Sequence, residues 1–289
     1  MLLHRHFEEE VYEPMPPKPR VTQVPLLSDR ATARKKRGKA AVYAGTKNLY
    51  GGMVTAAKSL MCHSDVNKIY FLIESKEFPY EIPKEIECVD ISKQDIFHWS
   101  GPNYNSHWTY MVLMRAALTK VFPDYDRILS LDVDTIVEDD ISDLWDIDMG
   151  DCVIGAVQEY HAKYRPYGPQ YWNAGVMLQD LKKLRETGRD DQIIHAINHE
   201  KFTYNEQCAI NKYCTGKIFD LPTRYNDCYI CGMSDKPAIV HYIGTSQWQT
   251  DKTLPRYELL EKYRAMSWDD VKRIRKSKYQ ADRSANRKG

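Results

Sequence analysis

Several features that define specialised classes of protein are missing from this sequence of 289 residues. It has almost no excess of charge, since 41 Lys and Arg residues oppose 40 Asp and Glu residues, a net charge of +1. A dedicated DNA-binding domain neutralises many phosphates and needs a large cationic surplus, so the balance argues against that function and predicts no nucleic-acid partner. No apolar run approaches the roughly 18–20 residues that are needed to cross a bilayer.

The sequence also lacks the marks of a secreted protein. Its seven cysteines are odd in number and scattered along the chain, which favours reduced thiols over a disulfide framework. The opening residues, MLLHRHFEEEVYE, are acidic and interrupted by polar side chains, unlike a secretory signal. Together these features predict a cytoplasmic location.

What the chain does contain is enough apolar sequence for one good core, with 43% hydrophobic and 28% charged residues. Residues 1–38 hold several prolines and most of a basic run, which predicts an N-terminal arm. Residues 39–266 are predicted to form the main domain. Residues 267–289 are rich in Lys and Arg and predict a solvated, frayed tail, with contact to an anionic surface as the alternative.

Short apolar runs alternate with helical stretches from residue 40 onward. The predicted strands are 40–44, 68–73, 86–91, 127–134, 152–157, 173–178, 217–221 and 238–243, and the predicted helices are 52–61, 106–122, 180–198, 205–213 and 256–265. This alternation predicts a single α/β domain with a Rossmann-like, mostly parallel central sheet and helices on both faces. In such a sheet, ligands bind beyond the carboxyl ends of the strands.

A pair of aspartates stands where one of these strands ends. Asp132 and Asp134 follow the apolar run RILSL, and their spacing places both carboxylates on the same side of an extended chain. Two buried like charges repel each other, and a divalent cation removes that penalty. Carboxylate oxygens suit Mg²⁺ or Mn²⁺. A solvated acidic turn is the alternative, because further acidic residues follow closely.

His241 lies inside another apolar run, AIVHYIG. An imidazole in such a strand is commonly a hydrogen-bonded core residue. Beside a carboxylate site it becomes a candidate ligand, which Mn²⁺ accepts more readily than Mg²⁺ does. Gly244 ends the run and allows the backbone to turn sharply or to approach a ligand closely.

Three further segments carry polar groups that a ligand needs. Arg115 lies in the stretch 106–122, which has almost no polar face, so its permanent charge reaches either an anionic partner or the surface. Asn173 opens a predicted strand, and Glu206 and Gln207 open a predicted helix. Such groups can pair with sugar hydroxyls, although Glu206 also fits a helix-start signal.

The loop after the first predicted strand, TKNLY, runs from Thr46 to Tyr50. A loop at that place in an α/β fold commonly receives a nucleotide. Tyr50 fits either stacking on a base or packing in the core.

Five stretches in this order, YDRILSLDVDTIV, YWNAGVML, EQCAIN, LPTRYN and HYIG, resemble retaining glycosyltransferase family 8. That family includes glycogenins, galactinol synthases and bacterial lipopolysaccharide hexosyltransferases. The order and spacing agree from about residue 40 to 250. The resemblance implies a GT-A fold and the metal-dependent transfer of a hexose from a UDP-sugar to a hydroxyl of a glycan, a protein or a small polyol. Mn²⁺ is the usual cation. The sugar, the acceptor and the oligomeric state stay open.

The resemblance also implies a role for each candidate residue. The implied roles are metal binding by Asp132, Asp134 and His241, donor binding by Ala44, Thr46, Tyr50, Arg115, Asn173 and Gly244, and catalysis by Glu206, Gln207 and Arg115. Glu206 falls where the family usually has Asp, which adds one methylene of reach toward the reacting face of the sugar.

The chain departs from the family pattern after the metal-binding histidine. The family commonly continues His-x-x-Gly-x-x-Lys-Pro-Trp, whereas this chain has Gln247 in place of the Lys. Removing a cation from developing negative charge can cost several kcal/mol of transition-state stabilisation. Lys252 or Lys47 is a candidate substitute. Because this Lys is missing, the alternative that the protein binds a nucleotide sugar without catalysis stays open.

Two other interpretations use parts of the same sequence. A phosphatase of the haloacid-dehalogenase type also has Asp-x-Asp after an apolar strand, but Ile136 stands where that motif has Thr or Val. Cys228 and Cys231 have the spacing of half a zinc site, without a second pair at finger spacing.

Overall fold

The computed structural model describes residues 21–23, 38–106, 108–160, 165–228, 234–244 and 247–280. The predicted arm at 1–38 lies almost wholly outside the described residues, as do the end of the predicted tail and Cys231. The domain limits at 39 and 266 therefore stay a prediction. Within the described ranges, no helix is both long and apolar enough to cross a bilayer.

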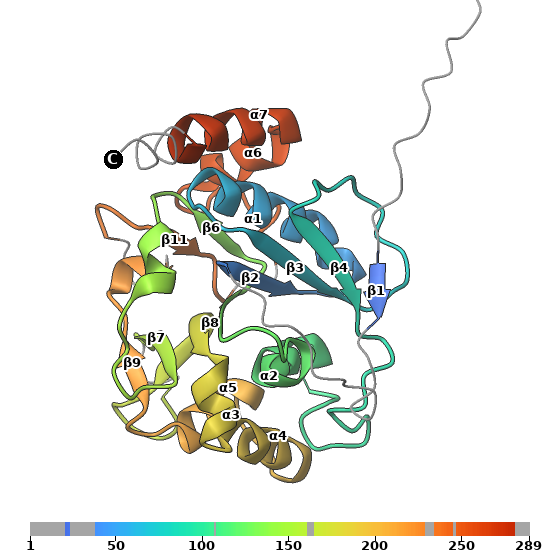
Figure 1. Ribbon diagram of the computed structural model, residues 1–289, viewed down its shortest axis with the longest axis vertical. Helices are drawn as coiled ribbons and strands as arrows, with labels where there is room; N and C mark the ends of the chain where they lie inside the picture. The colour runs from blue at the N-terminus through green and yellow to red at the C-terminus, as the bar shows by residue number, and fades with distance from the viewer. Residues whose placement is uncertain are drawn as a thin grey trace, which may run out of the picture.

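The centre of the fold is a sheet that contains eight strands within the described residues. The strands are β1 (Val21–Gln23), β2 (Ala40–Ala44), β3 (Lys68–Ile73), β4 (Ile86–Asp90), β5 (Arg127–Leu131), β7 (Ile154–Gln158), β8 (Trp172–Asp180) and β9 (Ile218–Asp220). Their order is β1-β4-β3-β2-β5-β8-β7-β9 (Figure 1). The first five in that order pair in parallel, and β8 runs antiparallel to both neighbours. The predicted mostly parallel sheet is confirmed.

A small second sheet supports one end of the first. It joins β6 (Thr135–Val137), β10 (Asp227–Cys228) and β11 (Ile239–His241) in the order β10-β11-β6. Because β6 follows β5 after a short turn, the small sheet is held against the end of the central one.

Helices and short helical turns connect the strands. The α-helices are α1 (Tyr50–Cys62), α2 (Leu118–Val121), α3 (Leu181–Glu186), α4 (Arg189–His199), α5 (Asn205–Tyr213), α6 (Tyr257–Ala265) and α7 (Trp268–Arg275). The 3-10 helices are η2 (Lys47–Leu49), η3 (Tyr110–Ala117), η4 (Ser142–Asp146) and η6 (Thr223–Asn226), and η8 (Lys276–Gln280) is a π-helical turn.

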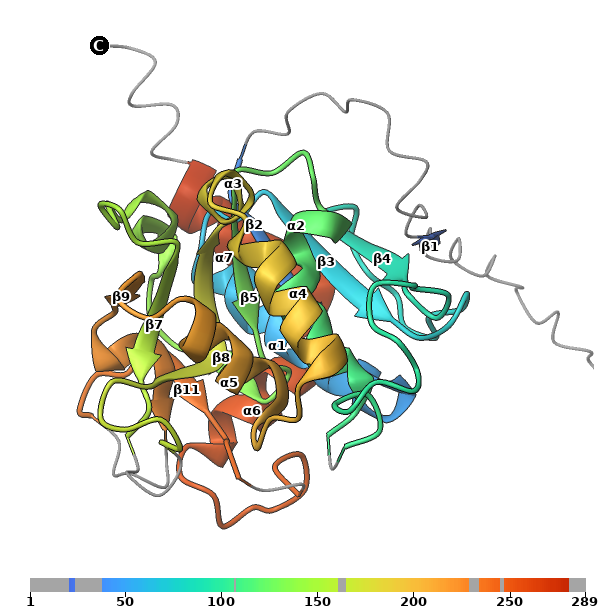
Figure 2. The same cartoon turned by 90° about the horizontal axis from the view of Figure 1, so that it is seen from below.

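Helices cover both faces of the central sheet, as predicted. One face carries α1, α6 and α7, and the other carries η3, α2, α3, α4 and α5 (Figures 1 and 2). In β2, Ala41 and Tyr43 belong to the first of the two cores, and Ala40 and Val42 belong to the second. Since side chains alternate along a strand, this uniformly apolar strand is buried on both sides.

Two predicted helices have a different form in the structure. Within the stretch 106–122, residues 110–117 form the 3-10 helix η3 and residues 118–121 form a single α-helical turn. The nearly uniformly apolar sequence has no periodicity that separates the two helix types. The stretch 180–198 is divided into α3 and α4 at Gly188, whose φ of 66° interrupts helical geometry.

Residues 268–275 of the predicted tail form an ordered helix, in place of the expected frayed segment, although most of its charged side chains are exposed. Ser267 caps α7 with a reciprocal pair of hydrogen bonds to Asp270. Val271 is fully buried, and α7 packs on α1. The Nε1 of Trp268 donates to the carbonyl oxygen of Glu81 at 2.8 Å. Residues 268–275 therefore belong to the folded body, because one side of a sequence rich in charge still presents apolar residues.

Candidate functional site

The two aspartates lie in the turn between β5 and β6. Asp132 follows β5 directly, and its backbone N–H donates to the carbonyl oxygen of Gly175 in β8 at 2.7 Å. The hydroxyl of Thr135 donates to the carbonyl oxygen of Asp132 at 2.7 Å and closes the turn. The carboxylates of Asp132 and Asp134 therefore converge through a fixed turn, at the end of the sheet where the sequence predicted a ligand site.

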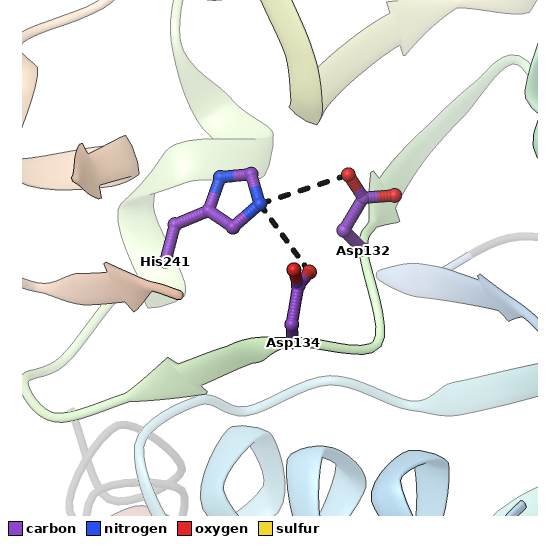
Figure 3. Close-up of side chains that lie close together, drawn as sticks. All are labelled: Asp132, Asp134 and His241. Carbon is purple, nitrogen blue, oxygen red and sulfur yellow. Dashed lines mark ion pairs between the residues drawn. The ribbon is translucent and has the colours of Figure 1, made fainter. Parts of the chain in front are cut away.

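The small sheet brings His241 to this turn. β11 runs antiparallel to β6 with His241 opposite Thr135, and the N–H of Tyr242 donates to the carbonyl oxygen of Asp134 at 2.9 Å. This register places Nε2 of His241 3.3 Å from Oδ1 of Asp134 and 3.7 Å from Oδ2 of Asp132 (Figure 3). The three side chains that the sequence predicted to act together do lie together.

These three side chains have the chemistry of a divalent-cation site. Their ligand atoms lie within 4.8 Å of one another, and two carboxylates with one imidazole suit Mn²⁺ or Mg²⁺. Burial acts to lower the pKa of His241, but the neighbouring carboxylates of Asp134 and Asp132 together raise it. Burial raises the pKa of Asp132 against the opposing charge of Arg115, and Asp134 adds to the rise.

Arg115 connects the aspartate turn to the start of α5. Its Nη2 lies 2.5 Å from Oδ1 of Asp132, and its Nε lies 3.2 Å from Oε1 of Glu206. Its Nη1 donates to the carbonyl oxygen of Ala174 at 2.6 Å. The alternative prediction, that the Arg115 guanidinium reaches the surface, is wrong. The guanidinium forms ion pairs with Asp132 and Glu206 inside the fold.

Glu206 and Gln207 begin α5 beside this arginine. Burial raises the pKa of the Glu206 carboxyl to about 7, against the opposing charge of Arg115. Gln207 accepts a hydrogen bond from the N–H of Ala174 at 2.8 Å, and its amide nitrogen donates to the hydroxyl of Tyr171 at 3.3 Å. Glu206 is thus a buried acid near the aspartate turn, while Gln207 holds strand β8 in place.

A chain of buried polar side chains leads away from the histidine. Nδ1 of His241 lies 2.7 Å from Oδ1 of Asn226, whose amide nitrogen donates to Oδ1 of Asn173 at 2.9 Å. The amide nitrogen of Asn173 donates to Oε2 of Glu159 at 2.9 Å. The sequence predicted Asn173 but missed Asn226 and Glu159. The signal for Asn226 was its place at the end of the LPTRYN stretch.

Gly175, which lies in β8 together with Asn173, leaves room for the ring of His241. A Cβ atom at this position would lie 2.2 Å from Cε1 of His241 and 2.9 Å from Oδ1 of Asn173. Any larger residue would therefore displace the imidazole. This gives a physical reason for glycine in the NAGV stretch.

Three of the residues predicted to bind the donor lie between the end of β2 and the start of α1. Ala44 borders a hollow of about 10 Å³ that Arg115 and Asp132 also line. The hydroxyl of Thr46 donates to Oδ1 of Asn48 at 2.6 Å. Tyr50 is buried, with its ring 5.0 Å from that of Phe78, so its packing in the core is established. Contact of these residues with a base stays a prediction.

A cavity of about 190 Å³ lies on the other side of the histidine. It is lined by residues that include Glu159, Asn173, Thr223, Asn226 and His241. Its walls carry amide, hydroxyl and carboxylate groups that can pair with hydroxyls. Gly244, which follows the histidine strand, has a φ of 88°, a backbone conformation that glycine adopts freely.

The structure gives no support to Lys252 as a replacement for the missing family lysine. Its ammonium group pairs with Oε1 of Glu261 at 3.6 Å, and its side chain is 77% exposed. Lys47 is exposed beyond the end of β2. Within the described residues, neither lysine has a recorded contact between its ammonium group and Asp132, Asp134 or His241.

The comparison with protein families decides the classification. Residues 41–251 match the family described as "Glycosyl transferase family 8". The chain belongs to glycosyltransferase family 8. The resemblance drawn from the motifs is confirmed, and the phosphatase alternative is wrong.

Individual relatives agree with this membership. The chain is 24% identical to "Probable glycosyl transferase Gly" of Streptococcus gordonii and 25% identical to "Glycosyltransferase GlyA" of Streptococcus pneumoniae serotype 4, with 85% of this chain covered in each case. The matches span 38% and 37% of those proteins, so the chain corresponds to less than half of their length.

Solved structures place the fold. The galactosyltransferase LgtC, determined with donor and acceptor sugar analogues, superposes with a TM-score of 0.65 at 20% identity, covering 81% of this chain and 99% of that one. The bifunctional glycosyltransferase WbbM superposes with a TM-score of 0.64 at 16% identity, covering 83% of this chain and 51% of that one. The predicted GT-A fold is confirmed.

Proposed function

We propose that this family 8 glycosyltransferase transfers a hexose from a UDP-sugar to a hydroxyl acceptor and keeps the anomeric configuration. The observation that carries the proposal is the convergence of Asp132, Asp134 and His241 in one cluster with cation-binding chemistry. Family membership supports the transferase chemistry, and the polar cavity beside His241 supports a hydroxylated acceptor.

In this proposal, Asp132, Asp134 and His241 hold Mn²⁺ or Mg²⁺, which supplies Lewis-acid stabilisation to the diphosphate leaving group. Arg115 keeps Asp132 oriented through its 2.5 Å contact. It also adds a fixed positive charge beside the leaving group, as the family resemblance suggests. In this proposal the nucleoside lies against Ala44 and Thr46 with Gly244 nearby, and the buried Tyr50 supports the loop that holds it.

In this proposal the transferred sugar lies beside the cation site, with Arg115 and Glu206 at one side of it. Glu206, whose carboxyl has a pKa of about 7, is ionised in part at neutral pH and stabilises positive charge at the anomeric carbon. Asn173 lines the cavity beside His241, and Gln207 follows Glu206 on α5. The bond between the anomeric carbon and UDP breaks, and the acceptor oxygen forms the new bond from the same face while its proton passes to the departing diphosphate. This happens either directly or after Glu206 or Gln207 has shielded the anomeric carbon.

The experiment is a screen of UDP- and GDP-sugars with Mn²⁺ that measures nucleotide release. We expect release from a UDP-hexose by the wild type, and loss of at least about 100-fold in Asp134→Ala, because the substitution removes a cation ligand. The matched control is Asp151→Ala, whose carboxylate is 78% exposed and pairs with Lys217. Unchanged turnover in Asp134→Ala or in excess EDTA, with the variant folded, contradicts the metal role.

A second candidate function is nucleotide-sugar binding without catalysis. Gln247 in place of the family lysine and the surface ion pair of Lys252 favour it. Calorimetric binding of UDP together with no release from any donor in the screen supports this candidate. Release with turnover rejects it.

A further inference from the structure

His241 has two ring nitrogens with different surroundings. Nε2 faces the carboxylates of Asp132 and Asp134, and Nδ1 faces the amide oxygen of Asn226 at 2.7 Å. A neutral imidazole carries its proton on one nitrogen and a lone pair on the other. Only the form with the proton on Nδ1 offers a lone pair toward the carboxylates, so the group at Nδ1 decides whether His241 can bind a cation.

The backbone fixes the direction of the hydrogen bonds that lead to Nδ1. The N–H of Gly175, which can only donate, points at Oδ1 of Asn173 at 2.8 Å. The amide nitrogen of Asn173 accordingly points at the Glu159 carboxylate, which accepts at 2.9 Å. The second lone pair of Oδ1 of Asn173 then receives the amide nitrogen of Asn226 at 2.9 Å. This orientation leaves Oδ1 of Asn226 facing His241, where it can only accept.

Burial shields this chain from water. Glu159, Asn173, Asn226 and His241 are exposed by 6%, 7%, 5% and 2% respectively. The side chains also border the cavity of about 190 Å³, but the hydrogen bonds between them leave few polar atoms free, and a reversed amide would place two donors or two acceptors face to face. Gly175 has two parts in this arrangement, since it supplies the anchoring N–H and leaves space for the ring.

We infer that Asn226, oriented by Asn173 and Glu159, is a positioning residue that keeps the proton of His241 on Nδ1 and the lone pair of Nε2 free for a divalent cation. This inference rests on the proposed metal-dependent function and deepens it. Asn226 acts through His241 rather than on the donor. Removal of the Asn226 side chain should raise the dissociation constant of the cation while the protein stays folded.

The test compares two substitutions of similar shape at one position. Asn226→Leu removes the acceptor, and we expect the Mn²⁺ dissociation constant, measured by titration of the full chain, to rise about 10- to 100-fold. Asn226→Asp can accept from Nδ1 with one oxygen and, when protonated, donate to Asn173 with the other. We expect it to bind Mn²⁺ within about 5-fold of the wild type.

The matched control is Asn211→Ala. Asn211 is another buried asparagine, and it contacts β8 through hydrogen bonds with the backbone of Trp172 at 2.7 and 2.8 Å. Loss of the Asn211 side chain should lower thermal stability. It should leave the Mn²⁺ dissociation constant within about 3-fold of the wild type, because Asn211 forms no hydrogen bond with the side chains of His241, Asn226, Asn173 or Glu159.

A second readout reports the proton itself. In the Mg²⁺-loaded wild type, long-range proton–nitrogen NMR should show the His241 ring protonated at Nδ1, with assignment by the signal that is lost in His241→Gln. Equal Mn²⁺ affinity in Asn226→Leu and the wild type, or a proton on Nε2 in the Mg²⁺-loaded protein, overturns the inference. A wild type that binds neither cation overturns the proposed metal dependence instead.

Discussion

Glu206 shows how strongly one residue depends on its surroundings in this protein. Its side chain is 6% exposed and lies 3.2 Å from Nε of Arg115. Burial raises the pKa of its carboxyl from 4.5 to about 7 in spite of that neighbour. Between these two values the folded state keeps a proton that the unfolded state has released, so the free energy of unfolding falls as the pH rises.

The pH dependence of Glu206→Gln follows from this sign. The stabilising effect of the protonated carboxyl is present below pH 4.5 and is lost as the pH rises through about 7. We expect the variant to gain about 1–3 kcal/mol relative to the wild type between pH 5 and pH 8, measured by urea unfolding in EDTA. A difference between variant and wild type that does not change with pH would show that Glu206 ionises normally in the folded state.

Individual elements show where sequence patterns work and where they do not. The strand 40–44 and the helix 205–213 have the predicted limits. Gly38 and Gly45 flank the strand, and Gly216 follows the helix. The stretch 106–122 is apolar nearly all round, so its sequence contains no periodicity that separates an α-helix from the observed 3-10 helix. Gly188 was a signal for the break in 180–198 that the helical pattern concealed.

The helix α7 is the element whose role the sequence concealed most. Its many charges suggested a frayed tail, but one buried residue, Val271, attaches it to the core. We expect Val271→Ala to lower the free energy of unfolding by about 1–3 kcal/mol, because it leaves a cavity beside α1. Lys272→Ala, in the same helix and 58% exposed, should change it by less than about 0.5 kcal/mol. If the two substitutions change the free energy of unfolding equally, α7 does not pack on the core and the prediction of a frayed tail is correct.

Across the whole molecule, the site is assembled from segments that the sequence keeps far apart. The type of each ligand could be predicted, because paired aspartates after a strand and a histidine in an apolar run are local signals. The chain from His241 to Glu159 could not, since it depends on the register of β11 against β6 and on the turn η6. The double contact of Arg115 with Asp132 and Glu206 likewise depends on packing between η3, β5 and α5.

This assembly predicts that cation binding stabilises the entire fold. The aspartate turn joins the two sheets, and His241 ends β11, so a cation held by all three side chains links segments that separate on unfolding. At a free Mn²⁺ concentration 100 times the dissociation constant, the stabilisation is about 2.7 kcal/mol. For a protein of this size, that raises the melting temperature by roughly 5–10 °C. EDTA should reverse the rise, because the unfolded chain does not bring the three ligands together. His241→Ala should show little of the rise, because it lacks one of the ligands. A melting temperature of the wild type that is the same in Mn²⁺ and in EDTA would mean that the three side chains form an ion-pair cluster without a cation.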